Sequence, residues 1–278
     1  LDRRAASFAL QIRGWQVFAL AHLFRFQSFL FDLSAPWSSI FKPDILNILG
    51  LGLVAAAFCW GRAATSRRLA LYLLAAAAIV VLFSPASSSW SWPALLPSRL
   101  EAYLRPVGNL GVFTLFPWIA FVFVGAYVGE FLASDRRPTD ERGFHLTLVL
   151  AGIVIAGAGA VGSYLPAPFA PSEFWTTSLS FFLIRVGVMT MALAAAWLWM
   201  QRPSSGRWSP LVLFGRHSLF VYWVHVALAY GAFSAPLHRA LPLGWSMVAF
   251  AILTLLMLGL TMWWNERGSG NREWAIGN

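Results

Sequence analysis

Long apolar segments alternate with short polar stretches along the whole chain. The apolar segments lie at 8–31, 44–60, 68–83, 110–132, 144–164, 178–200, 211–233 and 244–264. A hydrocarbon core of about 30 Å needs roughly 20 residues of helix to cross it, and the segments are near that length. The pattern therefore predicts an all-α protein, a polytopic transmembrane helical bundle of about eight helices that forms a single domain over residues 1–278.

The basic residues of the connections are unevenly divided between the two sides of such a bundle. If the N-terminus is inside, the outer connections hold only Lys42, Arg99, Arg105 and Arg239. The inner connections hold Arg3, Arg4, Arg62, Arg67, Arg68, Arg136, Arg137, Arg142, Arg202, Arg207, Arg267 and Arg272. Because Lys and Arg are retained on the cytoplasmic side, both ends of this chain are predicted to be cytoplasmic.

Composition agrees with a membrane protein and narrows the chemistry. Hydrophobic residues make up 59% of the 278 positions and charged residues 11%, whereas about a quarter of an average soluble domain is charged. The net charge of +9 is scattered over short loops, so no nucleic-acid partner is expected. Cys59 is the single cysteine, and no metal-ligand, Walker-type or G-x-S-x-G motif is present, so we expect no metal site.

Ionisable residues inside the apolar segments are the first candidates for function, because an uncompensated charge in hydrocarbon costs at least roughly 2.5–3.5 kcal/mol. In the first segment His22 and Arg25 are three residues apart and share one helix face. Asp44 and Asn47 enter the second segment at the same predicted level. We expect Asp44 to pair with Arg25. Alternatively, Asp44 follows Pro43 at a helix start and only stabilises the helix dipole, and the two roles are compatible.

Two later segments carry further polar candidates. Arg185 either reaches an anionic group or extends its long stem to the interface. Ser218, Tyr222 and His225 follow the i, i+4, i+7 spacing of one helical stripe, which hydrogen bonding between helices would also explain. Because histidine titrates near neutrality, His22 and His225 are the candidate bases, although a hydrogen-bonded core histidine is the alternative for each.

The segment at 110–132 carries Phe116-Pro117-Trp118 near its middle. An interior proline removes a backbone hydrogen bond and kinks a helix. We expect a kink at this point, which is one way to shape a pocket wall.

Several short motifs together resemble a known family. They are Arg13-Gly14, the run from Ala21 to Gln27, the run from Asp44 to Gly50, Phe116-Pro117-Trp118, and the run from Gly215 to His225. The chain resembles, over nearly its whole length, the bacterial relatives of the heparan-α-glucosaminide N-acetyltransferase catalytic domain. The Ser218-to-His225 pattern is also similar to the wider transmembrane acyltransferase superfamily.

That resemblance implies a bacterial inner-membrane enzyme, which takes an acetyl group from cytoplasmic acetyl-CoA and passes it to an amino sugar or another saccharide acceptor on the outer side. The family usually has two further helices ahead of this region, and its proposed catalytic histidine lies there. The chain begins at Leu1 rather than at methionine. We therefore expect it to lack upstream N-terminal helices, and that histidine is not assigned to any residue here.

Within this interpretation each polar candidate has a role. The catalytic candidates are His225, His22 and Asp44; the substrate-binding candidates are Arg25, Asn47, Arg185, Tyr222 and Ser218; Arg13 and Arg216 are the candidates for binding the phosphates of acetyl-CoA. The expected partners are the lipid bilayer and the saccharide, and the choice between a monomer and a homo-oligomer stays open. A transporter or channel for a small polar or anionic solute is the main alternative, and a noncatalytic membrane scaffold is a third.

Overall fold

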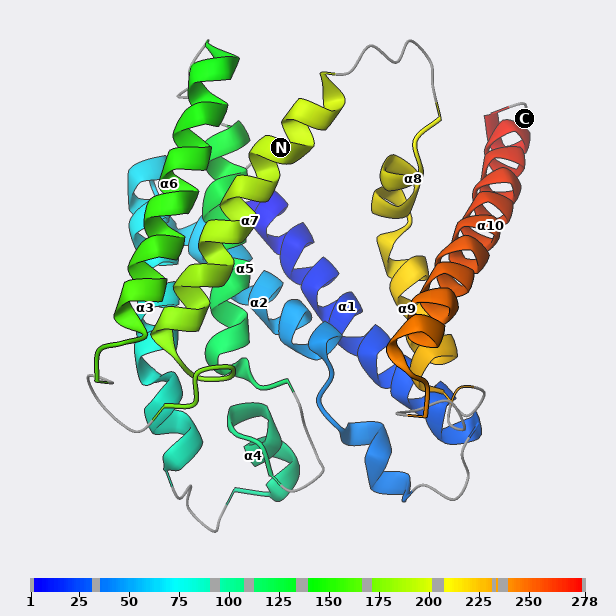
Figure 1. Cartoon of the computed structure of the whole chain (residues 1–278), viewed down its shortest axis with the longest axis horizontal. Coiled ribbons are helices and arrows are strands. Elements are labelled where there is room, and N and C mark those ends of the chain that lie inside the picture. Colours follow the sequence, from blue (N-terminus) through cyan, green and yellow to red (C-terminus); the bar gives the residue numbers. More distant parts are fainter. Residues whose placement is uncertain are drawn as a thin grey trace. The chain divides into compact units, whose positions relative to one another are not determined.

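The computed structural model of the chain describes residues 3–31, 36–90, 96–107, 113–133, 140–166, 172–201, 208–231, 234 and 240–276. Within these ranges every regular element is helical (Figure 1). The elements are α1 (Arg3–Phe31), η1 (Trp37–Phe41), α2 (Ile45–Arg62), α3 (Ser66–Ser89), α4 (Ser98–Leu104), α5 (Leu115–Ala133), α6 (Glu141–Gly162), α7 (Leu179–Met200), α8 (Pro210–Arg216), α9 (Ser218–Tyr230) and α10 (Leu243–Ile276). The prediction of an all-α protein is confirmed.

The length and apolar composition of the helices indicate a multi-pass membrane protein. Six of the described spans are long and apolar enough to cross a bilayer, namely η1 with α2, then α3, α5, α6, α7 and α10. The bent pair of α8 and α9 makes a seventh if it counts as one span. Helix α1 has 29 residues, which is about 43 Å of helix, but its polar and charged positions keep it out of this set. The predicted number of about eight is thus close to what the helices allow.

The chain divides into two compact units. Unit 1 comprises Leu1–Arg25 and Ser38–Arg202, and unit 2 comprises Phe26–Trp37 and Pro203–Asn278. The organisation of residues 1–278 as one functional domain stays a prediction.

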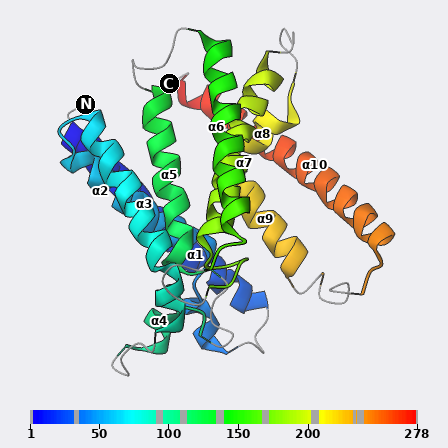
Figure 2. The same cartoon turned by 60° about the vertical axis from the view of Figure 1, so that its left-hand side comes forward.

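The core of unit 1 lies between α3, α5 and α7. Helix α3 buries one residue per turn, and this stripe packs against α5 and α7, as expected for a helix that shows one face to its neighbours. The buried residues of the cluster include Leu69, Leu73, Ala77 and Val81 of α3, Ala120 and Phe123 of α5, and Phe182 of α7. Figure 2 shows α3 beside α5 and α6 beside α7.

Small residues bring α6 and α7 into close contact. A Cβ atom built on Gly152 would lie 2.7 Å from the carbonyl oxygen of Gly187, and one built on Gly187 would lie 2.6 Å from the backbone nitrogen of Ala156. Lipid tails are as apolar as the side chains, so no hydrophobic effect drives helices together in a membrane. Small residues instead let two helix backbones pack closely.

We expect Gly152→Ala to lower the free energy of unfolding by about 1–2 kcal/mol, since overpacking forces backbones apart. The new Cβ would meet Met191 Cγ at 2.6 Å, on a flexible side chain, and also the carbonyl oxygen of Gly187 at 2.7 Å, which moves only with α7. Gly157→Ala in the same helix is the control, because nothing lies within 4 Å of its built Cβ. Thermal unfolding in detergent measures both, and equal midpoints for the two variants would contradict this packing.

The structure corrects two expectations about helix breaks. The expected kink at Phe116-Pro117 is present, since Phe116 interrupts α5 with non-helical φ −99° and ψ 121°, but it lies in the first turn of the helix and not near its middle. The residue before a proline is pushed towards extended angles, which explains the interruption. Conversely, the predicted helix at 211–233 is broken at His217, where α8 and α9 meet at 92°. His217 has φ −110° and ψ 27°, outside the helical region.

Candidate functional site

The start of α2 is fixed by its own first residues. Asp44 is the N-cap: it has extended backbone angles, and one of its carboxylate oxygens accepts a hydrogen bond from the backbone of Ile45 at 2.6 Å. The side-chain oxygen of Asn47 accepts the backbone N–H of Asp44 at 2.9 Å, which completes a capping box. Asp44 is 3% exposed and Asn47 is fully buried. The alternative role predicted for Asp44, as a helix-start residue, is therefore confirmed.

Close contact between backbones sets the distance between α1 and α2. A Cβ atom on Gly14 would lie 2.8 Å from Gly50 O, and one on Gly50 would lie 2.7 Å from Gly14 O and 2.8 Å from Phe18 N. Nearer the N-terminal end of α1, the Ser7 hydroxyl donates to the carbonyl of Ala57 at 2.6 Å. The two helices therefore run antiparallel, and the C-terminal part of α1 in unit 1 lies at the level where α2 begins.

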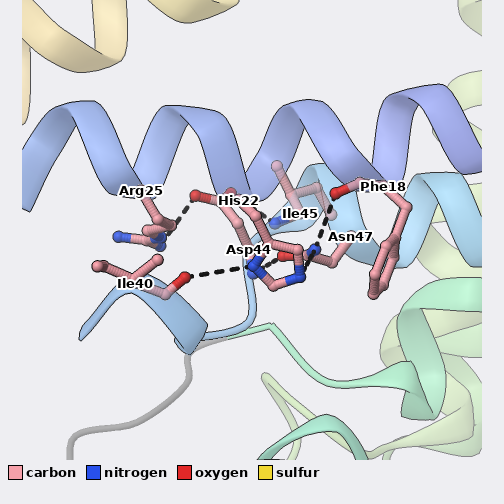
Figure 3. Close-up of polar contacts among 7 residues, drawn as sticks. All are labelled: Phe18, His22, Arg25, Ile40, Asp44, Ile45 and Asn47. Carbon is pink, nitrogen blue, oxygen red and sulfur yellow. Dashed lines mark hydrogen bonds and ion pairs between the residues drawn. The ribbon is translucent and has the colours of Figure 1, made fainter. Parts of the chain in front are cut away.

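Four predicted residues meet at that level and form what we call the α1–α2 polar cluster: His22, Arg25, Asp44 and Asn47 (Figure 3). Arg25 Nη2 lies 2.9 Å from Asp44 Oδ2, so the predicted ion pair is confirmed and coexists with capping. His22 Nδ1 lies 3.3 Å from the carbonyl oxygen of Ile40. Asn47 Nδ2 lies 3.4 Å from His22 Nε2.

These contacts assign the protons of the His22 ring. Because Asn47 Oδ1 accepts the backbone N–H of Asp44, its Nδ2 is the donor, and it faces His22 Nε2 and the carbonyl of Phe18, each at 3.4 Å. His22 Nε2 must then accept, and Nδ1 carries the hydrogen that is donated to Ile40 O. The ring is held as the Nδ1–H tautomer, with the lone pair of Nε2 turned towards a long and replaceable contact.

Aromatic rings surround the imidazole. Phe18 contacts His22 edge-on with ring centroids 5.1 Å apart, and Phe41 of η1 lies 6.1 Å away. Tyr103 of α4 stacks on Phe18 at 6.3 Å. Burial raises the pKa of the Tyr103 phenol to about 12, so this group stays protonated at neutral pH. The cluster thus combines one imidazole, one ion pair and one amide within an apolar surround.

The candidates Arg13 and Arg185, although also in unit 1, lie apart from the cluster. Arg13 is exposed and makes no ion pair or hydrogen bond to any other described residue. It adjoins Gly14, whose contacts to Gly50 and Val54 put Arg13 level with the middle of α2. Arg185 of α7 stacks on Trp118 and Phe181, with its guanidinium carbon 4.9 Å and 4.1 Å from the ring centroids.

The remaining candidates belong to unit 2. His225 Nδ1 donates to the carbonyl of Val221 at 3.0 Å, so in the neutral ring Nε2 is the nitrogen that carries the lone pair. The Tyr222 ring meets His225 at 5.6 Å, which agrees with their predicted place on one stripe. Ser218 is the first residue of α9 and is exposed, and Arg216 is exposed at the end of α8.

A pocket of about 580 Å³ lies at the break between α8 and α9. Arg216 and Ser218 both line it, together with Phe220, Trp223 and Trp264. His217 also lines the pocket, and its Nε2 lies 3.1 Å from Asn265 Oδ1 of α10. Trp223 Nε1 donates to Gln27 Oε1 at 2.5 Å. Sequence reasoning missed His217, because a prediction of one continuous helix gave no reason to expect a contact there. It missed Gln27 of α1, because the partner of Gln27, Trp223, is remote in the sequence.

Other signals were missed for identifiable reasons. The partner of His22 is the backbone carbonyl of Ile40, which no side-chain pattern reveals. Gly14 and Gly50 carried a usable signal, since small residues on apolar helices indicate close helix contacts. The described part of the chain contains no group of three or more His, Cys, Asp or Glu that would hold a metal ion.

Comparisons with protein-family models, with curated proteins and with solved structures give no significant match for this chain.

Proposed function

We propose that this membrane protein is an acetyltransferase, which moves an acetyl group from cytoplasmic acetyl-CoA to an amino sugar or another saccharide acceptor on the outer side of a bacterial inner membrane. The observation that carries the proposal is the α1–α2 polar cluster. In it His22 is held as one tautomer by Ile40 O, beside the buried Asp44 and Asn47. With both chain ends cytoplasmic, this end of unit 1 faces outwards.

In this proposal His22 is the general base. An acceptor amine or hydroxyl replaces the 3.4 Å contact from Asn47 and donates to the lone pair of Nε2. As the amine nitrogen attacks the thioester carbonyl carbon, its proton passes to Nε2. The carbon–sulfur bond then breaks, and the departing thiolate of coenzyme A takes the proton from the imidazolium. The ordered tautomer means that no rotation of the ring is needed before the proton moves.

Asp44, Arg25 and Asn47 act by binding and positioning. Asp44 engages Ile45 N and the Arg25 guanidinium through its two oxygens, so it holds the start of α2 against α1. The Arg25 guanidinium, which is 26% exposed at its side chain, offers remaining donors to acceptor hydroxyl oxygens. Asn47 offers an amide donor once the acceptor has entered. Asp44 is therefore a positioning residue in this proposal and not the base.

Arg13 is the proposed contact for the coenzyme phosphates in unit 1, and Arg216 stays a separate candidate for the same role in unit 2. Arg13 precedes His22 by nine residues, which is about 14 Å along a helix axis. Its side chain leans towards the N-terminus of α1, which is the cytoplasmic end in this proposal. The coenzyme would therefore extend along α1 from its phosphates to its thioester. His225, with Tyr222 and Ser218 on the same helix, is the second base candidate, and Arg185 stays a candidate acceptor contact.

Titration calorimetry with acetyl-CoA tests the donor half of the proposal. We expect saturable binding that weakens about tenfold in Arg13→Gln and in Arg216→Gln, because a charge-assisted hydrogen bond to phosphate contributes about 1.5–3 kcal/mol. Arg142→Gln is the control, since Arg142 is exposed near the start of α6. No binding by folded protein, or equal weakening in all three variants, would contradict a donor site at these residues.

Transport of a small polar or anionic solute is the second candidate, and one observation favours it. The 92° break between α8 and α9 resembles the discontinuous helices that form substrate sites in secondary transporters. Flux of glucosamine or acetate into protein-containing liposomes without any acyl donor would support transport. Acetyl transfer without such flux would support the enzyme.

A further inference from the structure

Arg185 is a cation held between aromatic rings. Its guanidinium lies over Phe181, one turn earlier on α7, and over Trp118 in the first turns of α5. Stacking on a ring face stabilises a guanidinium but leaves the N–H groups at its edge available, because they point outwards in the plane of the group. The two rings therefore orient the arginine without satisfying its hydrogen bonds.

The described residues provide no acidic partner for Arg185. Their ion pairs are Arg25–Asp44 and Arg105–Glu101. The nearest acidic residue before α7, Glu173, accepts a hydrogen bond from Thr176 Oγ1 at 3.2 Å and is exposed.

Three further segments of unit 1, 91–95, 108–112 and 167–171, contain neither Asp nor Glu. Among the described residues of unit 1, no carboxylate forms an ion pair that compensates the Arg185 charge.

The depth of Arg185 indicates what kind of group compensates it. Arg185 follows Leu179, the first residue of α7, by six residues, which is about 9 Å along the helix. Side chains of a helix lean towards its N-terminus, and the long stem of arginine extends to the interface. An uncompensated guanidinium would be costly at this depth. A phosphate at the membrane interface offers several oxygens, and two of them can accept parallel hydrogen bonds from the N–H groups of one guanidinium.

We propose that Arg185, with Trp118 and Phe181, forms a binding site for a phosphate group that enters at the membrane face where α7 begins. The headgroup of a phospholipid and a soluble phosphorylated compound share this chemistry. No contact between these three residues and the α1–α2 polar cluster is found among the described residues, and the proposal does not depend on acetyl transfer.

Native mass spectrometry of the full chain in detergent tests the site with three probes: dioleoyl phosphatidic acid, dioleoylglycerol, and inorganic phosphate as a competitor. We expect the protein to bind phosphatidic acid and to bind dioleoylglycerol at least tenfold more weakly. Loss of that binding on adding millimolar phosphate would identify a soluble ligand as the source, and its persistence would identify a lipid headgroup.

Variants locate the binding. We expect Arg185→Gln to weaken phosphatidic acid binding about tenfold or more, as a lost charged hydrogen bond requires, and Arg185→Lys to retain part of it. Arg62→Gln is the control, because Arg62 also lies over one ring, Phe58, at 4.6 Å, but at the end of α2, and should bind like the unchanged protein. Unchanged affinity in a folded Arg185→Gln protein would overturn the proposal. The proposal would also be overturned if the unchanged protein bound dioleoylglycerol as tightly as phosphatidic acid, and this second test requires no variant.

Discussion

Asp44→Ala is expected to lower the free energy of unfolding by about 2–3 kcal/mol. The substitution removes an N-cap, which contributes about 0.5–2 kcal/mol, and it leaves Arg25 without its 2.9 Å partner. Losing one member of a buried pair is costly because the other charge stays uncompensated, and partial exposure of Arg25 moderates that cost. Thermal and denaturant unfolding of the purified protein in detergent measure the change.

Asp44→Asn separates the two roles of this residue. Asparagine caps helices about as well as aspartate, so this variant retains the cap and loses only the charge. We expect it to lose about 1 kcal/mol, and Arg25→Gln added to it should cost little more, since the pair is already broken. If Asp44→Asn were as destabilising as Asp44→Ala, the cap would contribute nothing and our description of the α2 start would be wrong.

Gly50→Ala is the second large effect, on stability and on the site together. Its Cβ would meet backbone atoms of α1 on two sides, Gly14 O at 2.7 Å and Phe18 N at 2.8 Å, and neither atom can move without moving the helix. We expect a loss of about 3 kcal/mol, at the upper end for overpacking. Because His22 and Asn47 face each other across this helix pair, the acetyl transfer that we propose should fall at least tenfold in the protein that remains folded.

Gly125→Ala is the matched control for Gly50→Ala. Nothing lies within 4 Å of its built Cβ on α5, and alanine favours helix over glycine by roughly 0.5–1 kcal/mol. The control should therefore be as stable as the unchanged protein or slightly more so. A Gly50→Ala protein with unaltered unfolding would show that α1 and α2 are further apart than described.

The contacts of the site that could be predicted from the sequence are those that depend on local helix geometry. His22 and Arg25 share a face because they are three residues apart, and antiparallel neighbours bring the end of one helix to the start of the next. That reasoning predicts the Arg25–Asp44 pair and the position of Asn47. It also predicts the capping role of Asp44 after Pro43, since both are typical of helix starts.

The other features of the fold and the site depend on backbone conformation, which the pattern of apolar residues does not determine. An apolar run looks the same whether one helix passes through it or two helices meet at His217. The pattern likewise cannot tell whether Pro117 bends a helix or begins one. The tautomer of His22 follows from the carbonyl of Ile40, a backbone atom whose position is set only when η1 folds beside α1.

Acetyl transfer across a membrane would show whether the protein is the proposed enzyme. Protein is reconstituted in liposomes, labelled acetyl-CoA is supplied at the membrane face where α1 begins and glucosamine at the opposite face, and labelled N-acetylglucosamine is measured. We expect product in the glucosamine compartment. Its amount should fall at least a hundredfold in His22→Gln, within the range attributed to general acid–base catalysis. His145→Gln, a histidine near the start of α6, should retain transfer. Undiminished transfer in His22→Gln, or no transfer by folded protein with any saccharide amine, would contradict the proposed function.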